Sequence, residues 1–253
     1  MTAMPPGGTL VLLRHGESIF NATSTFTGLL DVGLTRAGER QVAIAANLMR
    51  AEGILPDLVI NSPMLRASRT TELLLGHLGR DVPVETTWRL AERDYGCLTG
   101  IPKAEAAARH GEHAFFEWRR TLHGRPPAAS AEQRATWVDP APVADSGPLV
   151  AGAGESLHDV VIRVRPLWEE ELHERLTDGA TVVVVAHGNT LRALCAVIDD
   201  LSDTEIEDLN IPAGHPLAYD VDHLGHARPR GGRYLDDAAA TVAAARVAAE
   251  GGT

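Results

Sequence analysis

Four consecutive valines within the segment Thr181–Ala186 constrain the fold of this chain more than any other feature of its sequence. A short apolar run of β-branched residues is typical of a strand that is buried on both faces of a sheet. The runs Leu10–Leu13 and Leu58–Ile60 have the same character. Segments with helical periodicity separate these strands. The alternation predicts an α/β fold, specifically a three-layer α/β/α sandwich with a mostly parallel sheet.

Capping residues indicate where the helices begin. Three such starts are predicted at Thr35, Ser156 and Ser202. We expect Ser62 and Pro63 to be the cap and first turn of a further helix, because serine caps helices well and proline fits their first turn. The helix that Ser156 opens is expected to run toward Leu176 and to kink at Pro166, which has no backbone N–H to donate.

The overall charge argues against polyanionic partners. The chain has 253 residues with 34 acidic and 23 basic side chains, a formal net charge of −11, and Lys103 is its single lysine. Proteins that bind nucleic acids usually show a basic surplus, so we expect no nucleic-acid partner. No apolar run approaches the roughly 20 residues that span a bilayer, so we expect no membrane insertion.

Redox and targeting features favour the cytoplasm. The two cysteines, Cys97 and Cys195, predict no disulfide framework. The segment Met1–Thr9 lacks the charged and apolar regions of a signal peptide, so a cytoplasmic location is expected. The eleven histidines are scattered without the spacing of a zinc site, so we expect no metal.

Two predicted strands each deliver a histidine followed by glycine, as His15 and Gly16 and as His187 and Gly188. In open α/β sheets ligands bind outside the carboxyl ends of the strands, so both histidines are expected to face one crevice. Asn189 then lies at a helix start, where free backbone N–H groups favour an anion. The alternative is two buried histidines satisfied by backbone carbonyls; two matching contexts favour the ligand site.

Arginines near these histidines fit a phosphate ligand. Arg14 stands between an apolar strand and His15, and Arg66 lies on the helix that follows Ser62. A guanidinium presents forked donors that match phosphate oxygens. A partly buried arginine must also find an anion.

The motifs together resemble the histidine phosphatase superfamily. They are Leu13–Ser18 with Asn21, Phe26–Gly28, Ser62–Thr70, Glu92–Gly96 and His187–Leu194. Within that superfamily, Lys103–Glu105 and Trp118–Arg120 are similar to the cofactor-dependent phosphoglycerate mutase branch. The resemblance runs from Leu10 to Gly251 and is weakest between Leu122 and Gly154. It implies one phosphoglycerate mutase-like domain over residues 1–253, with a lid or insertion at about 97–155 and a C-terminal helical tail at about 236–253.

The resemblance also implies roles for single residues. His15 would be the nucleophile that forms a phosphohistidine, and Glu92 the general acid and base. The phosphoryl oxygens would be held by Arg14, Asn21, Arg66 and His187. The substrate carboxylate would be held by Tyr95, Lys103, Arg119 and Arg120. Further substrate-binding positions implied are Ser18, Thr27, Gly28, Gly188 and Asn189.

Simpler structural roles compete with two of these assignments. Glu92 could form a salt bridge with Arg89 or Arg93 instead of acting on substrate. Adjacent residues on a helix point to different sides, so either Arg119 or Arg120 could face solvent.

The implied activity is the interconversion of 2- and 3-phosphoglycerate, an isomerase reaction of glycolysis and gluconeogenesis, primed by 2,3-bisphosphoglycerate and without a metal. The implied partner is a small anionic phosphoester, and the branch commonly forms homodimers or homotetramers. The alternative is a phosphatase in which water takes the phosphoryl group from His15. A phospho-ligand binder without catalysis is a third reading, which Glu92 disfavours because a pure binder needs no acid or base.

Some segments depart from the pattern of the branch. Asp94 replaces a histidine beside Glu92 and is expected to add negative charge near an anionic substrate. A tryptophan-containing segment has become Leu29–Asp31, and an expected proline cluster survives only as Pro126–Pro127. These changes concern the identity of the substrate more than the type of reaction.

Overall fold

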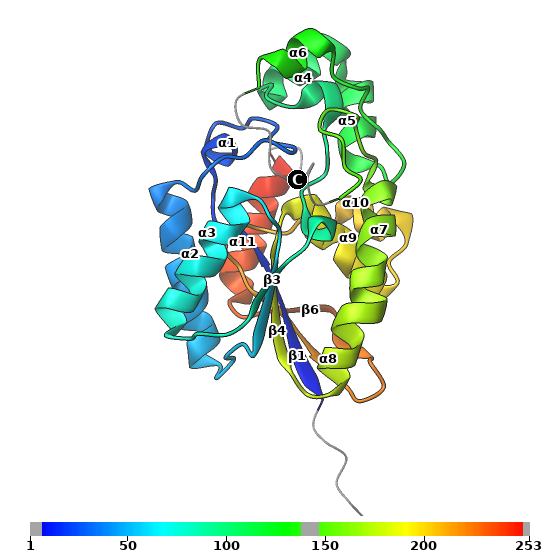
Figure 1. Ribbon diagram of the computed structural model, residues 1–253. Helices are drawn as coiled ribbons and strands as arrows, with labels where there is room; N and C mark the ends of the chain where they lie inside the picture. The colour runs from blue at the N-terminus through cyan, green and yellow to red at the C-terminus, as the bar shows by residue number, and fades with distance from the viewer. Residues whose placement is uncertain (1–6, 138–146, 250–253) are drawn as a thin grey trace, which may run out of the picture.

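The computed structural model describes residues 7–137 and 147–249, and its centre is one mixed sheet of six strands (Figure 1). The strand order is β3-β2-β4-β1-β5-β6. The first four strands in this order pair in parallel, whereas β5 and β6 are antiparallel to their neighbours. The strands are β1 (Gly8–Arg14), β2 (Leu58–Asn61), β3 (Val84–Thr86), β4 (Thr181–Ala186), β5 (Leu217–Val221) and β6 (Ala227–Tyr234).

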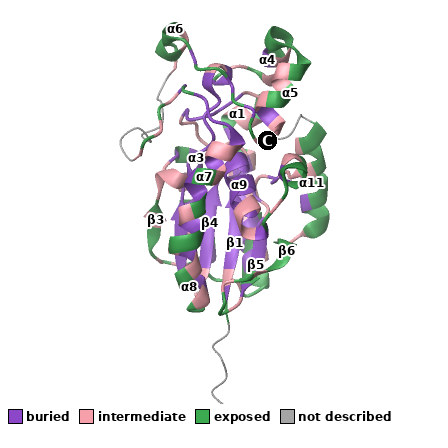
Figure 2. Ribbon diagram, turned by 90° about the vertical axis from the view of Figure 1, so that its right-hand side faces the viewer, coloured by how far each residue is buried: buried purple, intermediate pink, exposed green. Residues whose placement is uncertain are grey.

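Helices cover both faces of the sheet, which confirms the predicted α/β fold with a mostly parallel sheet. One face is covered by α2 (Arg36–Ala51) and α3 (Leu65–Leu78), and the other by α7 (Leu157–Pro166), α8 (His173–Thr177) and α9 (Gly188–Asp199). Figure 2 shows the strands buried between these layers and the outer helix faces exposed.

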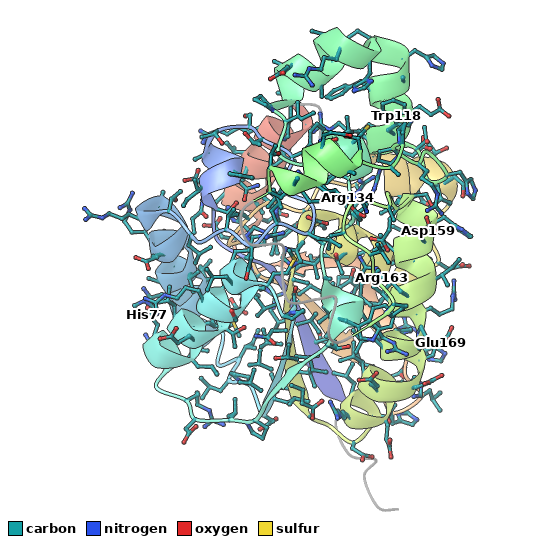
Figure 3. All side chains as sticks on the ribbon, turned by 45° about the horizontal axis from the view of Figure 1, so that its top comes forward. His77, Trp118, Arg134, Asp159, Arg163 and Glu169 are labelled. Carbon is teal, nitrogen blue, oxygen red and sulfur yellow. The ribbon has the colours of Figure 1, made fainter. Side chains whose placement is uncertain are left out.

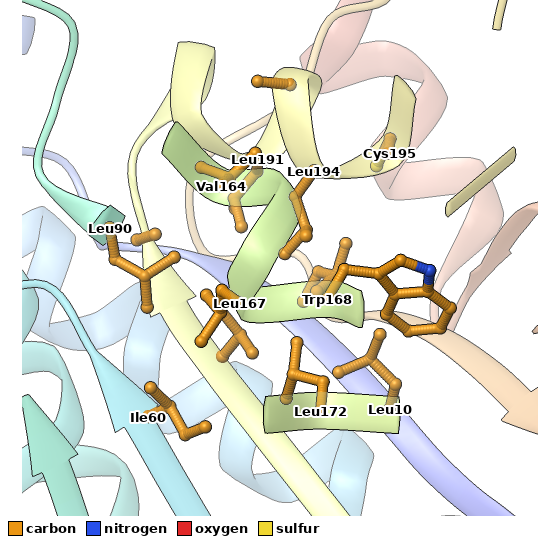
Figure 4. Packing of buried hydrophobic residues seen from close by; sticks show 14 of the residues in the cluster. Leu10, Ile60, Leu90, Val164, Leu167, Trp168, Leu172, Leu191, Leu194 and Cys195 are labelled. Carbon is orange, nitrogen blue, oxygen red and sulfur yellow. The ribbon is translucent and has the colours of Figure 1, made fainter. Parts of the chain in front are cut away.

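The valines of β4 pack alternately against the helices on the two faces of the sheet. Val183 and Val185 pack against α2 and α3, whereas Val182 and Val184 pack against α7 and α9. Successive side chains of a strand point to opposite faces, so a strand in the centre of a three-layer fold must be apolar throughout. Figure 4 shows the second of these cores, in which Trp168 and the leucines around it fill the space between sheet and helices.

Three strands were not predicted. β3 is short and lies at one edge of the sheet, and β6 lies at the other with exposed residues along most of its length. An edge strand that faces water lacks the apolar run by which buried strands are found, and it tolerates Pro229 within it. β5 is buried, but its sequence is short and ends in an acidic residue and a valine.

The predicted helix starts are correct at Thr35, Ser156 and Ser202, whose side chains accept from backbone N–H groups of the following turn. The start predicted at Ser62 is wrong. α3 begins at Leu65 after Met64, and the backbone N–H of Ser62 instead donates to the Val185 carbonyl as a continuation of the sheet.

The helix opened by Ser156 continues as predicted toward Leu176, but Pro166 changes its winding. α7 ends at Pro166, the segment η4 (Leu167–Leu172) is a π-helix, and α8 follows without a break. A proline cannot donate within the helical ladder, and a wider turn is one way for a helix to continue past it.

The remaining helices lie mainly beyond the carboxyl ends of the parallel strands (Figure 1). They are α1 (Ile19–Ala22), η1 (Trp88–Leu90), η2 (Gly96–Leu98), α4 (Lys103–His110), α5 (Glu112–Arg120), α6 (Ala131–Ala135), α10 (Asp203–Asp208) and α11 (Asp237–Ala249). α11 matches the helix expected in the tail, of which residues 250–253 lie outside the described part. Residues 138–146 of the expected lid also lie outside it. No helix within 7–137 and 147–249 is long and apolar enough to cross a membrane.

Candidate active site

His15 and His187 lie side by side where β1 and β4 end. Arg14 and Ala186 are register partners in the two parallel strands, and the backbone N–H of His15 donates to the Ala186 carbonyl over 3.0 Å. The two imidazole rings are 5.0 Å apart between centroids, with an angle of 62° between their planes. Both side chains are buried. The two histidines therefore lie next to one another where two neighbouring parallel strands end, as the sequence predicted.

The hydrogen bond of His15 fixes which ring nitrogen can react. Nδ1 lies 2.7 Å from the Gly16 carbonyl oxygen, which can only accept, so Nδ1 carries the proton of the neutral ring. Nε2 then keeps its lone pair. Burial, followed by the positive charges of Arg66 and Arg14, lowers the pKa of His15 well below its ordinary value of 6.5. The ring is thus neutral at physiological pH and can act as a nucleophile.

His187 has the opposite tautomer because of its two neighbours. Arg66 donates from Nε to Nδ1 of His187 over 3.2 Å, so the ring proton is on Nε2, which lies 2.7 Å from Ser62 Oγ. Burial and the nearby Arg66 lower the pKa of His187 well below 6.5. Sequence reasoning missed Ser62 as a site residue; its position just after β2, at the same edge of the sheet, was the signal that could have found it.

Arg66 is held by the loop that contains Gly28. It donates to the carbonyl oxygens of Leu30 over 2.9 Å and of Gly28 over 3.1 Å. Gly28 has a φ of 52°, and a Cβ there would lie 2.9 Å from Thr99 Oγ1. Burial lowers the pKa of Arg66 to about 10, which still leaves the guanidinium charged at neutral pH.

A small cavity of about 40 Å³ gathers six of the predicted site residues. It is lined by Arg14, Asn21, Thr25, Phe26, Thr27, Glu92, Tyr95 and Lys103. Two cations and several hydrogen-bond donors therefore meet one carboxylate in this space. A larger cavity of about 610 Å³ shares Arg14, Asn21, Thr25 and Lys103 with it, and residues of α11 form part of its wall.

Ser18 and Gly188 lie at the starts of two helices that follow β1 and β4. Ser18 is buried and caps α1, with its hydroxyl and backbone N–H both donating to Asn21 Oδ1. Gly188 is the first residue of α9 and is also buried. The hydroxyl of Thr190 donates to the Ala91 carbonyl over 2.7 Å and so ties the start of α9 to the loop before Glu92.

Glu92 is buried and hydrogen-bonded. Its Oε1 accepts from the backbone N–H of Arg93 over 2.8 Å and from Asn189 Nδ2 at 3.4 Å. The structure shows no salt bridge from Glu92 to Arg93 or Arg89 among the described residues. Arg163, on the inner side of α7 (Figure 3), donates to the carbonyl oxygens of Ala91 and Glu92 and pairs with the buried Glu155. The carboxylate is therefore anchored from several elements.

Arg119 and Arg120 point in different directions. Arg119 is buried with its guanidinium 5.4 Å from the centroid of the Phe26 ring, so it lies behind a wall of the small cavity. Arg120 donates to Asn210 Oδ1 over 3.3 Å and to the Glu207 carbonyl. Burial lowers the pKa of Arg120. Arg119 therefore lies against the Phe26 ring, whereas Arg120 is turned toward α10, and the carboxylate contact of each stays a prediction.

Asp94 does not add a free charge to the small cavity. Its carboxylate accepts from the backbone N–H groups of Gly96 and Gly154, each over 3.0 Å. Burial raises the pKa of Asp94. The residue that departs from the family pattern therefore joins the loop of Glu92 to the segment that precedes α7.

No group of three or more potential metal ligands occurs within the two described stretches of the chain. The groups that this arrangement brings together are a neutral imidazole, arginine and lysine cations, and a carboxylate.

Sequence comparison assigns the chain to a known protein family. The model of the histidine phosphatase superfamily (branch 1) matches residues 10–141 and 121–224. The chain belongs to this superfamily, whose members are enzymes that typically act on phosphoesters.

The similar proteins include mutases and phosphatases. The 2,3-bisphosphoglycerate-dependent phosphoglycerate mutase of Corynebacterium diphtheriae is 42% identical over 245 residues, and that of Mycobacterium tuberculosis is 45% identical over 248 residues; each match covers 96% of this chain and 98% of the relative. A mycobacterial glucosyl-3-phosphoglycerate phosphatase, solved with VO3, is 27% identical with a TM-score of 0.64, covering 84% of this chain and 92% of that one. YhfR of Bacillus stearothermophilus, 24% identical over 90% of this chain and 98% of its own with a TM-score of 0.68, shares the fold.

Proposed function

We propose that this enzyme is a 2,3-bisphosphoglycerate-dependent phosphoglycerate mutase that works through a phosphohistidine on His15. The observation that carries the proposal is the Nδ1 bond of His15 to the Gly16 carbonyl, which leaves a lone pair on Nε2. The preceding residue, Arg14, lines a cavity together with Lys103 and Glu92. Identity of 42–45% along nearly the whole chain to mutases supports it.

The charge of the two adjoining cavities suits a bisphosphorylated primer. Arg14 and Lys103 line both cavities and supply positive charge, and Asn21, Thr27 and Tyr95 supply hydrogen-bonding groups in the smaller one. The smaller cavity of about 40 Å³ has no room for such a molecule by itself, and the adjoining cavity of about 610 Å³ provides the volume. When bound, 2,3-bisphosphoglycerate would supply the phosphoryl group that primes His15.

The residues then have distinct tasks. His15 Nε2 forms the N–P bond while the P–O bond of the phosphoester breaks, and Arg14 with Arg66 stabilises the charge on the phosphoryl oxygens. Glu92 gives a proton to the leaving oxygen. In the second half, Glu92 takes a proton from the free hydroxyl of a monophosphoglycerate, and that hydroxyl attacks the phosphohistidine. The N–P bond breaks, His15 is restored and the glycerate now carries two phosphoryl groups, of which His15 can then take the one at the other position.

Hydrolysis of the phosphohistidine is the second candidate function. The larger cavity of about 610 Å³ beside the site offers room for water or for a bulkier phosphoester, and a similar fold serves a glucosyl-3-phosphoglycerate phosphatase. We propose that the lid at about 97–155 and the tail at about 236–253 decide between the two by limiting access of water.

A coupled assay of 3-phosphoglycerate with and without 2,3-bisphosphoglycerate tests the mutase proposal. We expect activity that depends on the primer and is insensitive to EDTA. Primer-independent phosphate release from phosphoesters, without interconversion, would instead identify a phosphatase. The homodimer or homotetramer expected for this branch can be tested in the same samples by light scattering.

A further inference from the structure

Arg192 is a fully buried arginine of α9 that no step of the proposed reaction uses. It lies one helical turn after Asn189. Its NH1 donates to Asn189 Oδ1 over 3.0 Å, and its NH2 donates to the Ile206 carbonyl oxygen in α10 over 2.6 Å. The guanidinium therefore spans from the last turn of α10 to the edge of the active site.

This contact determines the orientation of the Asn189 amide. An amide presents an acceptor oxygen at one end and a donor nitrogen at the other, in nearly the same shape. A guanidinium can only donate, so the oxygen of Asn189 must face Arg192. Its Nδ2 must then face the site, where it lies 2.7 Å from Tyr95 OH and 3.4 Å from Glu92 Oε1.

The direction of the Asn189 hydrogen bonds matters for both Glu92 and Tyr95. The Glu92 carboxylate faces the Nδ2 donor of Asn189 instead of the amide oxygen, which would repel it, and this contact keeps the carboxylate in place. Tyr95 OH accepts from Asn189, so its own proton remains available to donate into the small cavity that Tyr95 lines. With the amide reversed, Tyr95 would give its proton to Asn189 and lose it for the substrate.

We propose that Arg192 is a positioning residue, which acts through Asn189 to aim hydrogen-bond donors at Glu92 and Tyr95. The inference rests on the proposed function only in so far as Glu92 and Tyr95 act on the substrate.

The surroundings explain why a buried cation is tolerated here. Arg192 and Arg120 both donate to carbonyl groups near the end of α10, where the helix dipole is negative. Burial, together with Arg120 and Arg93, lowers the pKa of Arg192 to about 9, so that the side chain still donates as a cation at neutral pH.

A double-mutant cycle with Arg192→Met and Asn189→Ala tests the proposal. Methionine has similar length and bulk but no donor. Since a hydrogen bond to a charged group is worth about 1.5–3 kcal/mol, Arg192→Met should lower kcat by about 10-fold to 100-fold, with a smaller rise in KM. In the Asn189→Ala background the same substitution should change kcat by less than about threefold.

Two further variants separate positioning from stability. Arg192→Lys keeps one donor for Asn189 Oδ1 and should recover part of the lost kcat. Arg175→Met removes an arginine that pairs with Glu85 in β3, and it should keep the wild-type kcat. Melting temperatures identify variants that fail to fold; if Arg192→Met is one, Arg192→Leu, which also lacks a donor, replaces it in the cycle.

An equal drop in kcat in both backgrounds, or an unchanged kcat in Arg192→Met, would overturn the role of Arg192. If the wild-type enzyme hydrolyses phosphoesters but does not interconvert phosphoglycerates, the mutase proposal fails, and the cycle is measured on hydrolysis because both reactions use Glu92. A wild-type protein with neither activity would overturn both proposals.

Discussion

The hydroxyl of Ser62 lies 2.7 Å from Nε2 of His187, so a residue at the end of β2 fixes the ring at the end of β4. Because Nδ1 of the same ring accepts from Arg66, the imidazole is held at both nitrogens. His187 therefore keeps one orientation beside His15 before any ligand binds, and such preorganisation lowers the barrier for phosphoryl transfer.

Replacing Ser62 by alanine should release this ring. The Nε2–H of His187 would be buried without an acceptor, so we expect a loss of about 1–3 kcal/mol in the free energy of unfolding, together with a lower kcat. Urea denaturation and steady-state kinetics measure the two effects. Ser68→Ala is the control, because Ser68 donates only to carbonyls of its own helix turn. Equal stability of the two variants would contradict the role of Ser62.

Substitutions of His15 and of Glu92 should distinguish formation of the phosphohistidine from the proton transfers that accompany it. His15→Ala should abolish turnover and the acid-labile phosphoenzyme, because no other nucleophile would receive the phosphoryl group. Glu92→Gln should slow turnover by about 10²-fold to 10⁴-fold, yet leave a phosphohistidine that can be trapped with labelled primer. Turnover of His15→Ala at the wild-type rate would refute the mechanism.

The buried histidines predict how stability depends on pH. The pKa of both His15 and His187 is lowered in the folded state, so their contribution to stability is complete above about pH 6.5 and is lost as the pH falls below it. In the pH range where a histidine is protonated in the unfolded chain but neutral in the folded one, it lowers the free energy of unfolding by up to about 1.4 kcal/mol for each unit by which the pH falls. Denaturation between pH 5.5 and 7.5 should therefore give a shallower dependence for His187→Gln than for the wild type. If the free energy of unfolding changed with pH equally in the wild type and in His187→Gln, His187 would not be buried in its neutral form.

Arg163 should matter far more for stability than its neighbour Arg165 on the same helix. Arg163→Met leaves Glu155 buried without its partner and removes donors from the carbonyls of Ala91 and Glu92. Loss of one member of a buried pair typically reduces the free energy of unfolding by about 3–5 kcal/mol. Arg165→Met removes only an exposed pair with Glu169, for which we expect less than about 1 kcal/mol. Thermal or urea denaturation compares the variants directly, and similar losses would contradict this assignment.

Sequence reasoning located the strands and residues whose chemistry is local. The apolar runs that precede His15 and His187 predict both the central strands and the meeting of the two histidines, because parallel strands end at one edge. Capping at Thr35, Ser156 and Ser202 is equally local and was correct.

Features that depend on distant partners were not predictable in this way. The sequence around Ser62 predicts a helix cap, whereas in the fold its hydroxyl contacts His187 at the end of β4. The sequence around Asp94 predicts a charge near the substrate, whereas in the fold its carboxylate accepts from the backbone N–H of Gly154. The sequence predicted that Arg119 and Arg120 diverge but left open which of them turns away from the site, and the position of α10 gave Arg120 its partners. Each of these outcomes depends on tertiary contacts that no pattern within a short segment records.

The order of strands in the sheet has a consequence for biosynthesis. Of the described strands β1 is made first, but its two neighbours, β4 and β5, are made only after β2 and β3. His15, the proposed nucleophile, is therefore made long before Ala186, which accepts its backbone N–H, and before His187, which lies beside it. Pairing of such distant segments slows folding and leaves apolar strands exposed meanwhile. A nascent chain that stops before Thr181 carries His15 on a strand without its two neighbours, so the pair of His15 and His187 can form only after β4 has been made.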